Sequence, residues 1–322
     1  MQCDNKLGEG AYGCVYRSPK LPCASMKEGG EDFVGKIFGD LKLAKDEELI
    51  MEIVRTIDPQ SSFTIPLEKT CTFAPTAKLR KTCKHARDAA MVTQLVYAYR
   101  GVDLCFFMSS EKHYDIMDFL PGMVSLLKGL VMLAEARYCH RDIKPSNVMV
   151  HEGRFYLTDF GLMIPFDRLY DSDQDYILTF NYEYYPPEFK IYHDYRTIQG
   201  SDEVVQLSRF IASDVSANYV QSENRTDFTN IIDVVDKTLN TYSSSDLMRT
   251  AFEESADKVD IFGFGMVFTK MFLNSTPNVA KHSRDARRRL YAALRACTDP
   301  NPLTRHDPKT CLSDLTKLVV KG

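Results

Sequence analysis

Apolar and polar positions follow two different periods along this chain. Residues 33–38 (F-V-G-K-I-F) alternate with a period of two, which predicts a β-strand. Residues 41–57 instead bring Ile50, Met51 and Val54 to one side of a helix. A second amphipathic helix is predicted over residues 121–136, with an apolar side formed by Val124, Leu127, Leu130, Val131 and Leu133. Short or apolar runs at 91–99, 148–150 and 155–158 are typical of further strands.

A long segment between residues 188 and 260 also shows helical spacing. Its two apolar series are Val204, Leu207, Ile211 and Val215, followed by Phe228, Ile231, Ile232, Val235, Leu239 and Tyr242. Apolar positions three or four residues apart predict helices rather than an extended loop. We therefore expect a helical insertion over about residues 191–257.

Composition narrows the classes of protein that the chain can belong to. The 322 residues are 44% hydrophobic and 26% charged, which suits a globular core, and the net charge of -4 argues against a nucleic-acid binder. No apolar run reaches about 18 residues, so no membrane span or membrane partner is expected. The polar N-terminus lacks the apolar stretch of a secretory signal. Nine scattered cysteines then predict reduced thiols and a reducing compartment, cytoplasmic or nuclear.

The most specific motif is H-R-D-I-K-P-S-N at residues 140–147, with D-F-G following at Asp159, Phe160 and Gly161. The structural alternative is that Asp142 and Asp159 merely cap turns, as aspartate often does. Two caps embedded in these two motifs would be a coincidence. With this pair of motifs, the chain resembles the eukaryotic-type serine/threonine protein kinases, as a divergent member.

The resemblance assigns a role to each polar residue of these motifs. It implies that Asp142 orients the acceptor hydroxyl and takes its proton, and that Lys144 stabilises the transferring phosphoryl group. Asn147 and Asp159 would bind Mg²⁺ or Mn²⁺. A lysine two residues after Asp142 matches serine/threonine enzymes rather than tyrosine kinases.

Residues 7–15 fit the glycine-rich pattern G-x-G-x-x-G-x-V that lies over the phosphates of ATP in this family. The predicted ATP-binding residues here are Leu7, Gly8, Glu9, Gly10, Ala11, Tyr12, Gly13, Cys14 and Val15. A Rossmann turn has similar glycines, but no βαβ pattern follows, and Val15 stands where the family covers adenine. The loop begins at residue 7, from which we expect no regulatory module before the catalytic domain.

Lys36 stands where the family has its phosphate-anchoring lysine, and Gly35 is interpreted as replacing an alanine that touches adenine. A charged lysine inside a site needs an acidic partner, because an unpaired buried charge costs several kcal/mol. Glu47 is the predicted partner because it places Met51 in the core, whereas Glu48 would place Glu52 there. Glu48 remains the alternative.

Counting back from Asp103, the expected ribose contact, puts Tyr97 at the end of the adenine pocket (the gatekeeper position). Ala98, Tyr99 and Arg100 would then form the hinge that contacts adenine. A register with Thr93, Gln94 and Leu95 in these places is the alternative. Met149 is the expected contact on the other side of adenine.

Three further segments carry predictions of local structure. Residues 61–90 should hold a strand and a basic insertion, interpreted as a solvated loop or, alternatively, a docking patch. Residues 162–187 form the predicted activation segment, whose Asp167, Asp171, Asp173 and Asp175 are either a solvated acidic loop or a phosphate mimic opposite Arg141. Thr179 is the nearest counterpart of the family's threonine at the catalytic Asp. We expect Asp260 to hold the catalytic-loop backbone and Arg305 to pair with Glu188.

The resemblance implies an α+β, bilobal fold formed by one kinase domain over residues 1–322. Residues 1–99 would form the β-rich N-lobe and residues 100–322 the helical C-lobe. The expected activity is transfer of the γ-phosphate of ATP to serine or threonine of a protein substrate. The alternatives are a pseudokinase scaffold and a small-molecule kinase on a related fold. The insertion at 191–257 is either structural or a dock for a protein partner.

Overall fold

The computed structural model describes residues 6–10, 13–17, 33–111, 113–171, 183–189, 192 and 245–320. The chain divides into two units. The smaller unit consists of Met1–Val102, Met149–Glu152 and Tyr156–Gly161, and the larger unit consists of Asp103–Val148, Gly153–Phe155 and Leu162–Gly322.

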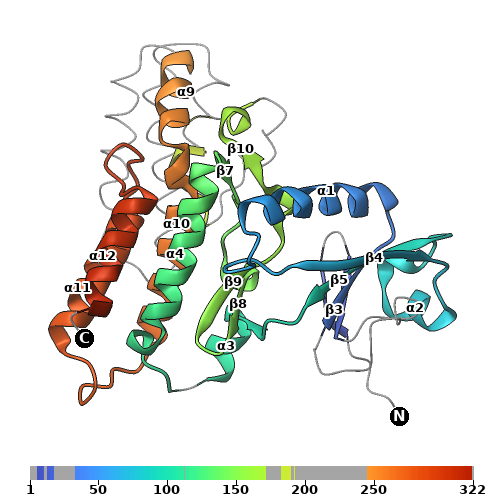
Figure 1. Ribbon diagram of the computed structural model, residues 1–322, viewed down its shortest axis with the longest axis horizontal. Helices are drawn as coiled ribbons and strands as arrows, with labels where there is room; N and C mark the ends of the chain where they lie inside the picture. The colour runs from blue at the N-terminus through green and yellow to red at the C-terminus, as the bar shows by residue number, and fades with distance from the viewer. Residues whose placement is uncertain are drawn as a thin grey trace, which may run out of the picture. The chain divides into compact units, whose positions relative to one another are not determined.

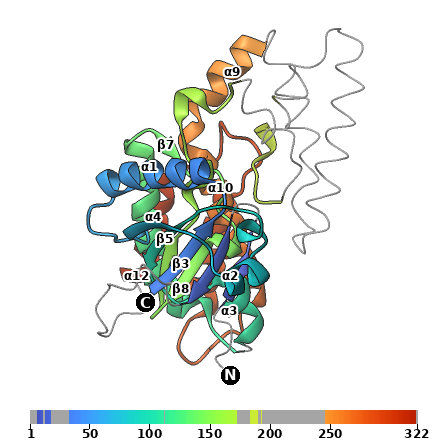
Figure 2. The same cartoon turned by 90° about the vertical axis from the view of Figure 1, so that its right-hand side faces the viewer.

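The smaller unit is built on a five-stranded antiparallel sheet in the order β1-β2-β3-β5-β4. Its strands are β1 (Lys6–Glu9), β2 (Cys14–Arg17), β3 (Phe33–Phe38), β4 (Leu67–Phe73) and β5 (Val92–Ala98). Strands β3 and β5 lie side by side in both views of the molecule (Figures 1 and 2). The strand predicted from the alternation at 33–38 is thus present with the same bounds.

Helix α1 (Leu41–Ile57) packs on this sheet, and its presence agrees with the helical spacing of the sequence. Its first turn is capped by Asp40, whose carboxylate accepts hydrogen bonds from the backbone N–H groups of Lys42 and Leu43. Ala44 of α1 packs with Phe38 of β3 and Leu95 of β5 in a buried cluster. The face of α1 that meets the sheet is therefore apolar at its start and continues through Met51 and Val54.

The basic stretch after β4 is not the solvated loop of one interpretation. It forms the helix α2 (Ala77–Thr82) and a 3-10 helix at Lys84–Ala86. The Thr76 side chain accepts a hydrogen bond from the N–H of Leu79 and caps α2, and the Arg80 guanidinium donates to the carbonyl oxygens of Ala86 and Arg87. A cap and side-chain bonds to the backbone stabilise this short helix.

A disulfide joins Cys14 of β2 to Cys83, which follows α2. The expectation that all cysteines are reduced thiols is therefore wrong for these two and for Cys71, which is also disulfide-bonded, and the prediction of a reducing compartment loses this support. Within the described part of the chain, the free thiols are those of Cys105, Cys139, Cys297 and Cys311. The disulfide closes a loop of sequence separation 69, which sequence spacing alone does not reveal.

Polar contacts surround the disulfide and involve the glycine-rich loop (residues 7–13). Backbone N–H of Lys84 donates to the carboxylate of Glu9 at 3.3 Å, and the His85 ring lies 3.0 Å from the carbonyl oxygen of Gly10. The Nζ of Lys6 donates to the Thr82 carbonyl oxygen at 2.6 Å. The end of α2 and the segment after it thus contact the glycine-rich loop through two hydrogen bonds, and contact the residues on either side of the loop, Lys6 and Cys14, through a hydrogen bond and the disulfide.

The larger unit is mostly helical (Figure 1). Its helices are α3 (Leu104–Ser110), α4 (Leu120–Glu135), α9 (Ser245–Glu254), α10 (Val259–Asn274), α11 (Arg284–Cys297) and α12 (Pro308–Val320). Helix α10 is buried along most of its length, and α4 packs on α12 while α10 packs on α11. Two short strands of this unit pair, β7 (Tyr138–Cys139) with β10 (Ile164–Pro165). A further small sheet has the order β6-β8-β9, formed by Val102–Asp103, Val148–His151 and Arg154–Leu157, and its residues are assigned partly to each unit. The predicted α+β fold class is confirmed.

By length and composition alone, residues 116–135 in the described part of the chain could span a membrane. This stretch is the 3-10 helix Ile116–Phe119 followed by α4, and 61% of its most apolar window is buried inside the molecule. Its apolar side chains are therefore used largely as core, for example Leu126, Leu127 and Leu130. Of the predicted insertion, the structure describes mainly α9. Both apolar series at 204–215 and 228–242 lie outside the described residues.

Candidate active site

In the smaller unit, Lys36 of β3 lies between two carboxylates. Its Nζ donates to Glu47 Oε2 at 2.6 Å and to Asp159 Oδ1 at 3.1 Å. Burial alone would lower the pKa of Lys36, but the charges of Glu47 and Asp159 outweigh it and raise the pKa. Lys36 is therefore a charged, partly enclosed ammonium held in place from two sides.

The choice between Glu47 and Glu48 follows from the direction of each side chain on α1. Glu47 belongs to the buried face of α1, together with Met51. Glu48 instead pairs with Lys45 at 2.8 Å on the surface of the same helix. The structure places Glu47, and not Glu48, against Lys36.

Gly35 does not occupy the position that the sequence interpretation gave it. Successive residues of a strand point to opposite faces, so Val34 shares a face with Lys36 and Gly35 points the other way. A Cβ at Gly35 would come within 2.9 Å of the Gln94 side chain, which is fully buried. The glycine is thus explained by Gln94, and the interpretation of lost adenine surface is wrong.

The two registers proposed for the hinge differ in the surroundings of Tyr97 and Thr93. The Tyr97 hydroxyl donates to Glu47 Oε1 at 2.6 Å, whereas Thr93 shares a hydrogen bond of 2.9 Å with Thr72 of β4. Strand β5 ends at Ala98, so Tyr99 and Arg100 lie just beyond the strand. Tyr97, not Thr93, is therefore the β5 side chain that reaches the Lys36 site, which favours the Tyr97 register.

The remaining predicted nucleotide contacts are distributed over both units. Met149 packs against the buried cluster of Ile65, Ala98 and Tyr156 in the smaller unit. Asp103 lies in the larger unit and caps α3, because its carboxylate accepts a hydrogen bond from the Phe106 N–H at 2.9 Å. Its expected ribose contact stays a prediction.

The glycine-rich loop is described except for Ala11 and Tyr12, which lie outside the described residues. Leu7, Gly8 and Glu9 belong to β1, and Cys14 and Val15 belong to β2. At Gly13 a Cβ would lie 2.6 Å from the carbonyl oxygen of Ile37, so the sheet itself requires glycine there. Within the described part of the chain, no atom comes within 4 Å of a Cβ added at Gly8 or Gly10. Protein packing in that part does not account for these two glycines.

In the larger unit, the catalytic loop gathers three predicted residues around one carboxylate. Lys144 Nζ lies 2.8 Å from Asp142 Oδ2, and the amide nitrogen of Asn147 donates to the same oxygen at 2.9 Å. The Asn147 nitrogen also donates to the backbone carbonyl oxygen of Asp142, at 2.9 Å. These bonds orient the Asp142 carboxylate. Both bonds of the Asn147 side chain use its amide nitrogen, and neither uses its amide oxygen.

The backbone of the catalytic loop is held from below by Asp260 of α10. Its carboxylate accepts hydrogen bonds from the N–H groups of His140 at 2.7 Å and Arg141 at 2.9 Å, as expected from the sequence. Arg141 has φ of 65°, in the left-handed region that is costly for a side chain of this size. Asp260 thus stabilises a strained backbone directly before Asp142.

The ionisation of Asp260 predicts a pH dependence of stability. Burial raises its pKa to about 6, although the His140 and Arg141 N–H groups partly oppose this. In the unfolded chain the pKa is near 3.8, so the folded protein binds the proton more tightly between these values. The free energy of unfolding is therefore expected to fall, by on the order of 2 kcal/mol, as pH rises from about 4 to about 6.

Urea unfolding between pH 4 and pH 7 checks this expectation against Asp260→Asn, which has no carboxyl group to titrate. The variant should be less stable at neutral pH because it lacks one acceptor for the two N–H groups, and its decline between pH 4 and pH 6 should be smaller. Equal slopes in the two proteins would contradict the assignment.

The end of the activation segment is fixed by a buried ion pair. Arg305 donates to both carboxylate oxygens of Glu188, at 2.7 and 2.8 Å, and both side chains are almost fully buried. Earlier in the segment, Asp171 pairs with Arg249 of α9 at 2.7 Å. Asp173, Asp175 and Thr179 lie outside the described residues. Asp171, one of the four acids considered as a phosphate mimic opposite Arg141, is thus paired with Arg249.

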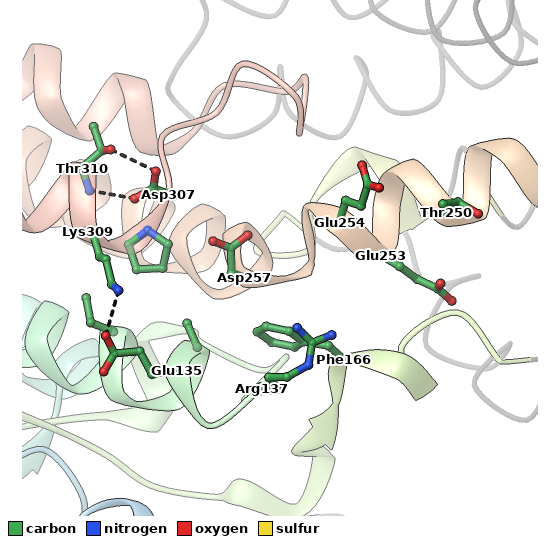
Figure 3. A pocket seen from close by; sticks show the side chains of 13 residues that line it. Glu135, Arg137, Phe166, Thr250, Glu253, Glu254, Asp257, Asp307, Lys309 and Thr310 are labelled. Atoms are coloured by element: carbon green, nitrogen blue, oxygen red, sulfur yellow. Dashed lines mark hydrogen bonds and ion pairs between the residues drawn. The ribbon is translucent and has the colours of Figure 1, made fainter.

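A cavity of about 810 Å³ lies elsewhere in the larger unit, at the C-terminal end of α4 (Figure 3). The charged residues of its lining are mostly acidic: Glu135, Glu253, Glu254, Asp257 and Asp307, with Arg137 and Lys309 as the basic residues. Glu135 is paired with Lys309 at 2.9 Å, and Asp307 accepts hydrogen bonds from Thr310. None of the predicted site residues lines this cavity, so it is separate from the catalytic loop.

The fold and these two clusters define a class of protein. A general model of the protein kinase domain matches residues 1–199, and the chain therefore belongs to the protein kinase family.

Similar curated proteins bear kinase names. Cyclin-dependent kinase 14 of Xenopus tropicalis is 28% identical over 177 residues, which cover 49% of this chain and 33% of that protein. The human protein of the same name is 27% identical over 170 residues, covering 49% of this chain and 29% of that protein. The mitosis inhibitor protein kinase SWE1 of Candida albicans is 29% identical over 132 residues, with 39% and 10% covered. The match thus spans a third or less of the length of these relatives.

Proposed function

We propose that this protein is an ATP-dependent kinase that transfers the γ-phosphate of ATP to serine or threonine hydroxyls of protein substrates. The observation that carries the proposal is the arrangement around Asp142. Its carboxylate is buried, with 8% of the side chain exposed, and is oriented by its bonds to Lys144 and Asn147. A carboxylate fixed next to an ammonium suits a reaction in which a hydroxyl loses a proton as a phosphoryl group arrives.

The residues also suit a nucleotide with a divalent cation. The amide oxygen of Asn147 and the carboxylate of Asp159 are hard oxygen donors, which Mg²⁺ and Mn²⁺ prefer. We assign metal binding to these two residues. A bound divalent cation would neutralise negative charge on the phosphates. The open surroundings of Gly8 and Gly10 within the described residues support the approach of a phosphate to the loop backbone.

The protein residues then divide the work of the reaction. Lys36, held by Glu47, binds the α- and β-phosphates with its charged ammonium. Asp142 accepts a hydrogen bond from the acceptor hydroxyl, orients it and takes its proton, and Lys144 stabilises the charge of the transferring phosphoryl group. Most of the rate enhancement comes from positioning and electrostatics, since the proton transfer itself contributes about 10²–10⁴-fold.

Lys144 supports serine and threonine as acceptors, and the names of the relatives support kinase activity in general. The partner of the reaction is accordingly a protein. The insertion at 191–257 remains a candidate dock for such a protein.

A peptide-library assay with ATP and Mg²⁺ tests the proposal. The purified protein should phosphorylate a subset of serine or threonine peptides and leave tyrosine peptides unmodified. Lys36→Met, which removes the ammonium at the phosphates, is the matched inactive control. Transfer to tyrosine only, or to small-molecule hydroxyls only, would contradict the acceptor class. No transfer by the wild type to any acceptor would favour the scaffold alternative.

A further inference from the structure

The Glu47 carboxylate has a second partner besides Lys36. Tyr97 donates its hydroxyl proton to Glu47 Oε1 at 2.6 Å, while Lys36 occupies Oε2 at the same distance. Each oxygen of Glu47 therefore has its own donor. Because Glu47 is only 8% exposed, water has little access to replace either of them.

The position of Tyr97 follows from the register of the sheet. Its Cα lies opposite Val34, and Lys36 lies opposite Leu95, so Tyr97 and Lys36 project from the same face. The Tyr97 ring packs against the cluster of Phe38, Ala44 and Leu95. This packing fixes the ring, and the hydroxyl at its end reaches α1.

The protonation state of Tyr97 suits a donor. Burial raises its pKa well above the usual range, and the nearby charge of Glu47 acts in the same direction. The phenol stays protonated at neutral pH and donates to the carboxylate. A hydrogen bond to a charged group is among the stronger ones in proteins.

We propose that Tyr97 is a positioning residue, which holds the Glu47 carboxylate in the orientation that engages Lys36. The inference rests on the proposed function, because it assigns Tyr97 a role in placing the lysine that binds the phosphates. Tyr97 acts through Glu47 and does not itself touch the phosphates. Loss of the hydroxyl leaves Glu47 Oε1 enclosed without its hydrogen-bond donor. The carboxylate then rotates toward a different donor, and Lys36 is no longer held in its fixed position.

Tyr97→Phe tests the role because it removes the hydroxyl and keeps the ring. We expect kcat/KM for ATP to fall about tenfold, the equivalent of about 1.4 kcal/mol, with KM for the peptide unchanged. In a Glu47→Gln background, the same change should alter kcat/KM for ATP by less than about twofold, because Tyr97 acts through that carboxylate. A purely structural hydroxyl would give the same loss in both backgrounds.

Tyr114→Phe is the matched control. Tyr114 is buried and donates its hydroxyl proton to the carbonyl oxygen of Met271 in the larger unit, so this variant loses a comparable bond away from Lys36. Its kcat/KM for ATP should stay within about twofold of the wild type. The proposal would be overturned if kcat/KM for ATP of Tyr97→Phe also stayed within twofold of the wild type. It would equally be overturned if Tyr97→Phe lowered kcat/KM for ATP by the same factor in the wild-type and the Glu47→Gln backgrounds.

The nucleotide-induced rise in Tm separates this proposal from the proposed function. If the wild type transfers no phosphate but is stabilised by ATP, the proposed function fails. The effect of Tyr97→Phe is then measured as a change in the ATP-induced rise in Tm, with and without Glu47→Gln. Tyr97→Phe should reduce the rise by more than half in the Glu47 background only. If the wild type neither transfers phosphate nor shows an ATP-induced rise in Tm, both proposals are overturned together.

Discussion

Replacing Asp142 by asparagine is expected to lower kcat about 10³-fold, within the 10²–10⁴-fold range of acid–base contributions. The substitution keeps the size of the side chain but removes the negative charge that accepts the proton. Lys144 also loses its ionic partner at 2.8 Å. Initial rates with a peptide found in the library, over a range of ATP concentrations, give kcat and KM.

ATP affinity should change by less than about threefold in Asp142→Asn, because the predicted phosphate ligand Lys36 keeps its two carboxylates. Asp285→Asn is the control, since Asp285 is exposed at the start of α11 and is bonded only to arginines of its own helix among the described residues. It should retain wild-type kcat. An Asp142→Asn protein with more than a tenth of wild-type kcat would contradict the assigned role.

The second large effect concerns stability. Arg305→Met is expected to lower the free energy of unfolding by about 3–5 kcal/mol, because it leaves the Glu188 carboxylate buried without its cation. Arg305 and Glu188 are 0% and 1% exposed, so water cannot compensate for the lost partner. Urea unfolding of the two proteins at pH 7 measures the difference.

A double variant separates the lost attraction from the cost of an isolated charge. Glu188→Leu with Arg305→Met removes both charges and should recover most of the stability lost in Arg305→Met alone. Lys309→Met, which breaks the exposed pair with Glu135, should cost less than about 1 kcal/mol. If Arg305→Met cost no more than Lys309→Met, the buried pair would not be a main support of the fold.

The elements that could be predicted from the sequence are those with a long and regular pattern. The bounds of α1 and β3 agree with the prediction because burial on one side imposes a period on many residues. Helix α2 has only six residues and depends on the Thr76 cap and on Arg80, so it leaves no comparable pattern. The disulfide of Cys14 depends on a partner far away in the chain, which spacing does not indicate.

The candidate site divides in the same way. Asp142, Lys144 and Asn147 are neighbours in the sequence, and a local motif therefore brings them together. Contacts between distant strands and helices are harder to predict. The sequence predicts Tyr97 at the end of the adenine pocket, but it does not predict the hydrogen bond from the Tyr97 hydroxyl to Glu47. The face of β3 to which Gly35 points depends on the pairing of β3 with β5, which the local sequence does not reveal.

Because Cys14 and Cys83 are joined by a disulfide, the covalent state of a purified sample depends on the reducing agents to which it was exposed. Dithiothreitol in a purification or assay buffer donates electrons to this bond and returns two thiols, so proteins handled with and without it are different covalent species. In the reduced species, noncovalent contacts among the described residues, such as the hydrogen bond of Lys84 to Glu9, join the glycine-rich loop to the segment after α2. Rates and affinities measured on the two species therefore describe two proteins, and a non-reducing gel of each sample tells which one was assayed.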